Sequence, residues 1–155
     1  YNMAGWRDGF VVGNRHIIQG LRTLKTNLDY SIFSAIQTAA ETALNLPDSY
    51  LEDVRHRYRT RRDCLISGLA DLGWDVPKTK ATMYLWVPCP PDMTAADFAF
   101  HVLQNTGVVV TPGSAFGEGG EGFVRVSLIA EEDRLKEAIQ RLKDVGVRYP
   151  SSVTV

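Results

Sequence analysis

The stretch VVVTPGSAFGEGGEGFVRVSL, residues Val108–Leu128, constrains the fold of this chain more than any other. Two apolar runs, Val108–Val110 and Phe123–Ile129, flank a loop of small residues that is rich in glycine. Branched and aromatic side chains favour strands, and glycine adopts backbone conformations that other residues resist. The pattern therefore predicts two strands joined by a broad, irregular connection.

Within the second strand, the alternation of side chains places Arg125 on the same face as Phe123 and Ser127. An arginine flanked by Val124 and Val126 is drawn toward apolar surroundings, where its guanidinium needs an anion, and a carboxylate suits its planar fork best. A structural ion pair or a snorkelling arginine at a sheet edge explains the same pattern. The glycine loop is not predicted to bind nucleotide phosphates, because neither GK[ST] nor GxGxxG is present there.

The composition is that of an ordinary globular protein of one domain, or of one domain and a piece of another: 155 residues, 45% hydrophobic and 23% charged. A net charge of −1 gives no argument for nucleic acid as a partner. No apolar run approaches the ~20 residues of a membrane span. We therefore expect neither a nucleic acid nor a membrane partner. Because the chain opens at Tyr1 within what reads as a working motif, we also expect a fragment.

Helical spacing of apolar residues predicts one helix from about Ser31 to Pro47 and a longer helix from Ser49 to Gly73. Ser49 and Glu52 have the spacing of a capping box at the start of the longer helix. Acidic residues are interleaved with its arginines, which favours a solvated face over a nucleic-acid footprint. These arginines are Arg55, Arg57, Arg59, Arg61 and Arg62.

From residue 76 onward, the pattern predicts strand, helix, strand, strand and helix. The first strand covers residues 81–87, Thr94 with Asp97 caps the next helix, and a last helix follows residue 131. This order predicts an α+β two-layer sandwich with both helices on one face of a small sheet. Phe10–Val12 reads as a lone strand whose sheet partners are missing from the chain.

The residues alone exclude several kinds of site. The three histidines are far apart and lack metal-ligand spacing, so we expect no metal. No G-x-S-x-G elbow is present, and no nucleophile is predicted. Arg7 stands between Gly5 and Gly9 just before an apolar run, where it could bind an anion or be an ordinary surface arginine.

Three motifs in the same order resemble the class I/II aminotransferases, which are fold-type I pyridoxal-phosphate enzymes. YNMAGWRDGFVVGN resembles their segment Ser-Lys-x-Tyr-Asn-Met-x-Gly-Trp-Arg, which contains the cofactor lysine. ATMYLWVPCP resembles their small-domain strand, and VVVTPGSAFGEGGEGFVRVSLIAEEDRLKEAIQRL resembles their C-terminal end. The resemblance covers Tyr1 to about Val145.

This resemblance implies roles for individual residues. Arg7 corresponds to the arginine that binds the phosphate of pyridoxal 5'-phosphate, and Arg125 to the arginine that holds the substrate α-carboxylate. LKTNLDYSIFSAIQ is similar to LL-diaminopimelate and aspartate-type members, in which this loop reaches the neighbouring subunit. Asn27 is therefore a candidate substrate contact across a homodimer, and Arg22 a weaker candidate for a distal acidic group. An ordinary loop residue remains an equal alternative for each.

The resemblance also implies what the chain lacks. The Schiff-base lysine would lie two residues before Tyr1, so we expect no catalytic residue in this chain. Residues 1–46 are predicted to be a remnant of the α/β large cofactor-binding domain. Residues 47–149 are predicted to be a long connecting helix and the small C-terminal domain, and residues 150–155 a loose tail.

The implied function is that of the C-terminal part of a PLP-dependent aminotransferase, which transfers an amino group between an amino acid and a 2-oxo acid. The whole enzyme is expected to be cytoplasmic and homodimeric, and the chain alone is expected to be inactive without the upstream large domain. Two alternatives remain open at this point. One is another fold-type I reaction such as a C–S lyase, and the other is a non-catalytic orphan domain.

Overall fold

The computed structural model describes residues 1–29 and 31–150. The chain divides into two compact units, Tyr1–Val54 and Arg55–Val155. The division falls inside a long helix rather than in a loop.

The first unit is helical. Its elements are η1 (Ala4–Trp6), α1 (Arg15–Leu28), α2 (Ser34–Leu44) and the first turns of α3 (Asp48–Ala70). The side chain of Asn14 accepts a hydrogen bond from the backbone N–H of His16 at 2.9 Å and so caps α1. The shorter predicted helix is present but begins at Ser34, and the longer one begins at Asp48, one residue before the predicted cap.

The strand predicted at Phe10–Val12 is wrong. These residues form no strand, and their exposed fractions are 71%, 60% and 81%. A strand forms only where a neighbour pairs with its backbone N–H and C=O groups, and the described residues supply none at this place. Within the described part of the first unit only Ala43 is buried, so this unit has almost no core of its own.

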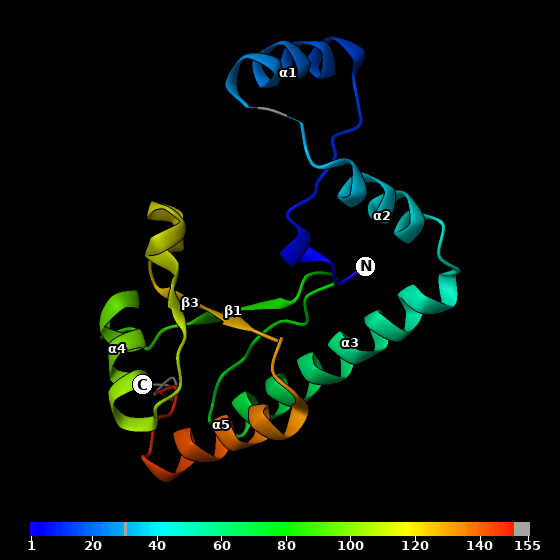
Figure 1. Cartoon of the computed structure of the whole chain (residues 1–155). Helices are drawn as coiled ribbons and strands as arrows, with labels where there is room; N and C mark the ends of the chain where they lie inside the picture. The colour runs from blue at the N-terminus through cyan, green and yellow to red at the C-terminus, as the bar shows by residue number, and fades with distance from the viewer. Residues whose placement is uncertain (30, 151–155) are drawn as a thin grey trace. The chain divides into compact units, whose positions relative to one another are not determined.

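The second unit contains the sheet (Figure 1). After α3 come β1 (Tyr84–Pro88), α4 (Ala95–Thr106), β2 (Thr111–Pro112), η2 (Gly113–Phe116), η3 (Glu118–Gly120), β3 (Phe123–Ser127) and α5 (Glu132–Asp144). The strands are antiparallel in the order β1-β3-β2, which places β3 in the centre. The strand predicted at Val108–Val110 is displaced, because the chain pairs with β3 only at Thr111–Pro112.

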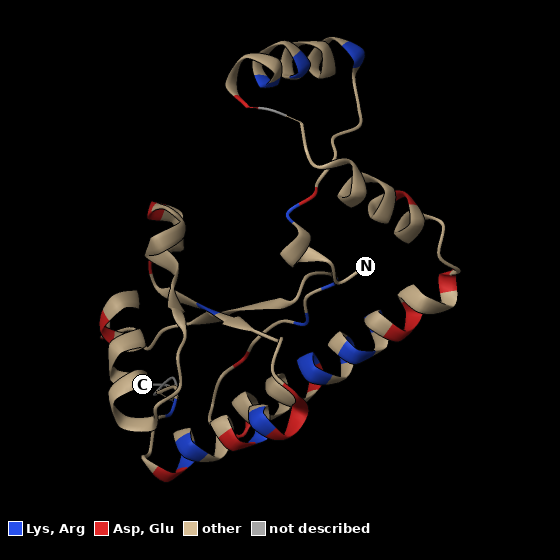
Figure 2. Ribbon diagram, in the orientation of Figure 1, with Lys and Arg blue, Asp and Glu red and all other residues tan. Residues whose placement is uncertain are grey.

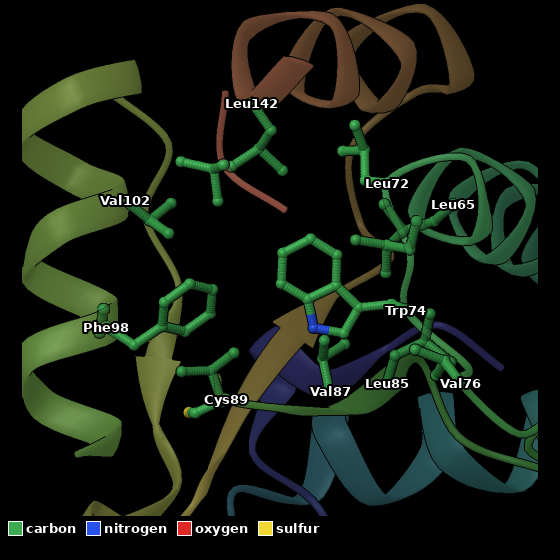
Figure 3. Packing of buried hydrophobic residues seen from close by; sticks show 14 of the residues in the cluster. Leu65, Leu72, Trp74, Val76, Leu85, Val87, Cys89, Phe98, Val102 and Leu142 are labelled. Atoms are coloured by element: carbon green, nitrogen blue, oxygen red, sulfur yellow. The ribbon is translucent and has the colours of Figure 1, made fainter. Parts of the chain in front are cut away.

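The core of the second unit is built around Trp74, which follows α3 (Figure 3). Its indole Nε1 donates a hydrogen bond to the carbonyl of Pro88 at 2.8 Å, and its ring lies 6.1 Å from Phe98 and 5.7 Å from Tyr149, between centroids. The polar edge of the indole is thus satisfied where the rest of the ring is buried. The fully buried side chains around it include Leu72, Leu85, Val124 and Leu128.

The predicted boundaries of α4 are confirmed by its caps. The Thr94 side chain accepts from the backbone N–H of Asp97 at 3.1 Å, and Gly107 ends the helix in the left-handed region at φ 69°. A glycine is favoured there because a Cβ would strain that backbone.

One arginine of α3 departs from the predicted solvated face. Figure 2 shows basic and acidic residues along α3, yet Arg61 is only 4% exposed. Its Nη1 donates to the carbonyls of Leu128 and Ile129 at 3.3 and 3.0 Å, and its Nη2 lies 2.5 Å from the carboxylate of Glu131. The carbonyls that follow β3 and the carboxylate at the start of α5 therefore compensate the buried charge.

The architecture is helical with a small three-stranded antiparallel sheet. The two-layer sandwich and the division into residues 1–46 and 47–149 stay predictions. Of the predicted tail, residues 151–155 lie outside the described residues.

Candidate functional site

Arg125 lies in the middle of the central strand. It stands opposite Trp86 of β1 and Thr111 of β2, so its backbone is paired on both sides. Val124, its neighbour, points into the core and is 1% exposed, whereas Arg125 is half-buried on the other face. The predicted alternation of this strand is confirmed at these two positions.

Two aromatic rings hold the guanidinium of Arg125. Its Cζ lies 4.2 Å from the ring centroid of Tyr84 on β1 and 4.2 Å from that of Phe116 on η2. A cation over the face of an aromatic ring is attracted by the negative charge of that face. The same region continues as an aromatic cluster, because Trp86 lies 6.0 Å from Phe116 and stacks at 5.9 Å on Phe123.

The loop that carries Phe116 is closed at its base. A Cβ on Gly113 would lie 2.1 Å from the carbonyl oxygen of Gly120, and one on Gly120 would lie 2.0 Å from that of Gly113. Only glycine permits such a close approach of two backbone segments. The loop predicted to be irregular thus consists of two short 3-10 turns whose outer ends, Gly113 and Gly120, are in close contact, and Phe116 belongs to the first turn.

Arg125 has no anionic partner among residues 1–29 and 31–150. Neither a side-chain hydrogen bond nor an ion pair joins it to any described residue. By contrast, the buried Arg61 and the half-buried Arg62 both contact carboxylates. A half-buried guanidinium that is held by two rings and has no carboxylate partner has the chemistry needed to bind the carboxylate of a ligand.

Arg7 lies at the end of η1 in the left-handed region at φ 57°. Its backbone N–H donates to the carbonyl of Ala4 at 3.2 Å, and its Nη1 donates to the same oxygen at 3.3 Å. The side chain is exposed, and none of the described residues pairs with it as a carboxylate. A Cβ at Gly5 or at Gly9 would meet nothing within 4 Å, so the backbone is open at both of these glycines.

Asn27 does not lie in a loop. It belongs to the last turn of α1, and its Nδ2 donates to the carbonyl of Thr23 at 2.7 Å. Arg22 lies on the same helix, five residues earlier, and is exposed. Nearby, Lys25 and Asp29 form an ion pair at 2.7 Å. Arg7, Arg22 and Asn27 thus belong to the first unit and Arg125 to the second.

Two further classes of site are missing from the part of the chain that the structure describes. No group of three or more histidine, cysteine or acidic side chains there could hold a metal ion. None of its helices combines the length and apolar character that a bilayer crossing requires.

Residues 1–142 match the family model described as aminotransferase class I and II. The chain belongs to that family.

Relatives and solved structures agree with this membership. Over 149 residues the chain is 49% identical to LL-diaminopimelate aminotransferase 2 of Trichormus variabilis, and 44% identical to LL-diaminopimelate aminotransferase of Halothermothrix orenii. Each match covers 96% of this chain and 38% of the relative. The fold is similar to that of BacF from Bacillus subtilis, with a TM-score of 0.87, 34% identity, and coverage of 97% of this chain and 39% of BacF. An aminotransferase from Staphylococcus aureus gives a TM-score of 0.87, 37% identity, and coverage of 97% and 40%.

This class I and II aminotransferase chain spans about two fifths of the length of the relatives it matches. The family depends on pyridoxal 5'-phosphate. The donors around Arg7 fit the phosphate of that cofactor: an exposed guanidinium whose described bond goes to one backbone carbonyl, beside open glycine backbone. That Arg7 binds it stays a prediction, as do the roles of Asn27 and Arg125.

Tyr84 and Phe116 were not predicted to belong to the site. Both belong to motifs that carried the family resemblance, but Tyr84 lies about forty positions from Arg125, and Phe116 lies within the glycine-rich loop that precedes β3. The face of Tyr84 could have been predicted from strand alternation, because Tyr84 and Trp86 point to one face of β1 while Leu85 is buried on the other. The position of Phe116 depends on the closed loop, which no periodicity encodes.

Proposed function

We propose that the chain is the C-terminal part of a PLP-dependent aminotransferase, which transfers an amino group between an amino acid and a 2-oxo acid. The observation that carries the proposal is Arg125, a half-buried guanidinium between two aromatic contacts without an anionic partner among the described residues. Membership of the aminotransferase family supplies the reaction class.

Each of the chain's own residues has a binding role in this proposal. Arg125 binds the α-carboxylate of the substrate in two parallel hydrogen bonds and thereby orients the bond that reacts at Cα. Arg7 binds the phosphate of pyridoxal 5'-phosphate, which supplies an electron sink when it is bound. The remaining length of the polypeptide supplies the reactive lysine and the large domain.

The proposed substrate is LL-diaminopimelate, because the two relatives described above act, by name, on that amino acid. Its second carboxylate requires another cation, for which Arg22 is the candidate, and Asn27 is a substrate contact across a cytoplasmic homodimer. LL-diaminopimelate and L-lysine differ by that distal carboxylate. We therefore expect kcat/KM to be much lower for L-lysine than for LL-diaminopimelate.

The test is the Arg125→Lys substitution in the full-length polypeptide. Lysine keeps the charge but loses the fork, so kcat/KM should fall roughly 10²–10⁴-fold, or by about 3–5 kcal/mol. Cofactor affinity should barely change. The control compares an amino acid with the amine that lacks its carboxylate. Wild type should discriminate strongly between the two, and a mutant that remains equally selective would show that Arg125 is only structural.

A further inference from the structure

We propose that Tyr84 and Phe116 are positioning residues for Arg125, and that they restrict its guanidinium to planar anions that approach along its edge. The inference rests on the proposed carboxylate role of Arg125 and concerns how that role is made selective. Its basis is the pair of 4.2 Å contacts from two separate elements to one guanidinium.

The distances determine which directions remain open. A carbon 4.2 Å from the centroid of a ring lies over the ring face, because an approach in the ring plane would meet the hydrogens of its edge. Tyr84 and Phe116 therefore occupy space next to the guanidinium that an anion would otherwise use. The N–H groups point outward in the guanidinium plane, where a carboxylate accepts two parallel bonds. A tetrahedral anion can also place two oxygens on this edge, but its remaining groups then project above and below the guanidinium plane, where Tyr84 and Phe116 occupy space.

The structure supports each ring independently. Tyr84 belongs to β1, whose backbone pairs with β3 two positions away from Arg125, at Ser127. Phe116 is held by Trp86 at 6.0 Å and by the closed loop base at Gly113 and Gly120. The rings are thus set before a ligand arrives, and a guanidinium held between them loses little freedom on binding.

The experiment uses the 155-residue chain and two probe anions, acetate and methanesulfonate. Both carry one negative charge and one methyl group, but acetate is planar at its oxygens and methanesulfonate is tetrahedral. The Nε–H signal of Arg125 is identified in an NMR spectrum of the labelled chain by its loss in Arg125→Lys. Dissociation constants for both anions then come from its shift during titration.

In wild type, the Arg125 signal should lie upfield because of the ring currents, and acetate should bind with an about fivefold lower dissociation constant than methanesulfonate. Phe116→Leu and, separately, Tyr84→Leu should move the signal downfield and reduce the preference to about twofold or less. Phe116→Tyr, which keeps an aromatic ring, should retain both the upfield position of the signal and the preference for acetate. Phe100→Leu, at an exposed phenylalanine of α4, should change neither.

The possible failures are distinguishable. If acetate leaves the wild-type signal unmoved, the carboxylate role of Arg125 is wrong, and the proposed function loses its main support. If acetate binds and its preference over methanesulfonate survives in both leucine variants, that role stands and the positioning role of the rings is wrong. The amide spectrum of each variant establishes that it is folded, and a loss of the preference in either folded leucine variant supports the positioning role of the ring that it removes.

Discussion

Arg7 offers the most direct single-residue test of the cofactor site. In the full-length polypeptide, Arg7→Ala should weaken retention of pyridoxal 5'-phosphate by about 1.5–3 kcal/mol, because the phosphate loses a charge-assisted partner. Equilibrium dialysis of the cofactor measures this, with Arg15→Ala on α1 as the control that should retain it. The assignment is wrong if cofactor affinity is unchanged while amino-acid affinity falls.

The titration of Cys89 should make the free energy of unfolding depend on pH. It is buried, and burial together with the Glu121 carboxylate raises the pKa of its thiol from 9.0 to about 11. The unfolded chain loses this proton first, so stability is fully present below pH 9 and falls as the pH rises toward 11, by at most about 1.4 kcal/mol per pH unit.

Urea unfolding between pH 8 and pH 11 measures that slope. Cys89→Ala removes the titrating group, so its loss of stability over this range should be smaller than that of the wild type. The buried thiol should also react with iodoacetamide at pH 8 more slowly than Cys64, which is partly exposed. Equal slopes in the two proteins would show that the pH dependence arises elsewhere.

At the scale of elements, the closed loop between β2 and β3 depends on Gly113. In Gly113→Ala the new Cβ would lie 2.1 Å from the carbonyl of Gly120 and 2.7 Å from that of Phe123, so the backbone must shift. We expect a loss of about 2–4 kcal/mol in the free energy of unfolding. Gly119→Ala is the matched control, because its Cβ meets nothing within 4 Å, and it should change stability by no more than about 0.5 kcal/mol. Similar stabilities of the two variants in urea would mean that the loop base is not constrained.

The same elements show what periodicity can and cannot predict. The caps of α4 and the two faces of β3 were predictable, because Thr94 and the alternating valines act within a few residues. The burial of Arg61 was not, since its partners at Leu128, Ile129 and Glu131 lie almost seventy positions away. Local patterns describe how a segment folds, whereas the partner of a buried charge depends on which segments meet.

The same distinction applies to the candidate site, of which only part could be predicted from the sequence. Arg7 and Arg125 could be named from motifs, because those motifs are contiguous in sequence. The helical environment of Asn27 could not, since apolar spacing around residues 17–26 was ambiguous. The lone strand at Phe10–Val12 was predicted from an apolar run, with its sheet partners missing from the chain, and without a paired neighbour these residues form no strand.

At the scale of the whole molecule, the two units should differ in their resistance to proteolysis. Every residue of the main core cluster lies between Leu65 and Val147, whereas exposed apolar side chains are common in residues 1–54. Limited trypsin digestion of the full chain should therefore cut first in the first unit, for example after Lys25, and leave a fragment that begins in α3. Leu72→Ala should cost about 2–5 kcal/mol and abolish the protection of that fragment. Uniform resistance through the first fifty residues would contradict this difference.

The packing of Tyr149 on Trp74 has a consequence for synthesis on the ribosome. Tyr149 donates its backbone N–H to the carbonyl of Leu72 at 3.0 Å, and its ring closes one side of the indole. Translation from residue 72 to residue 149 takes about 4–15 s at usual elongation rates, and throughout that time the nascent chain lacks this cover. The core around Trp74 is therefore completed only after residue 149 has been synthesised. Until then its apolar surface is available to chaperones and to other nascent chains.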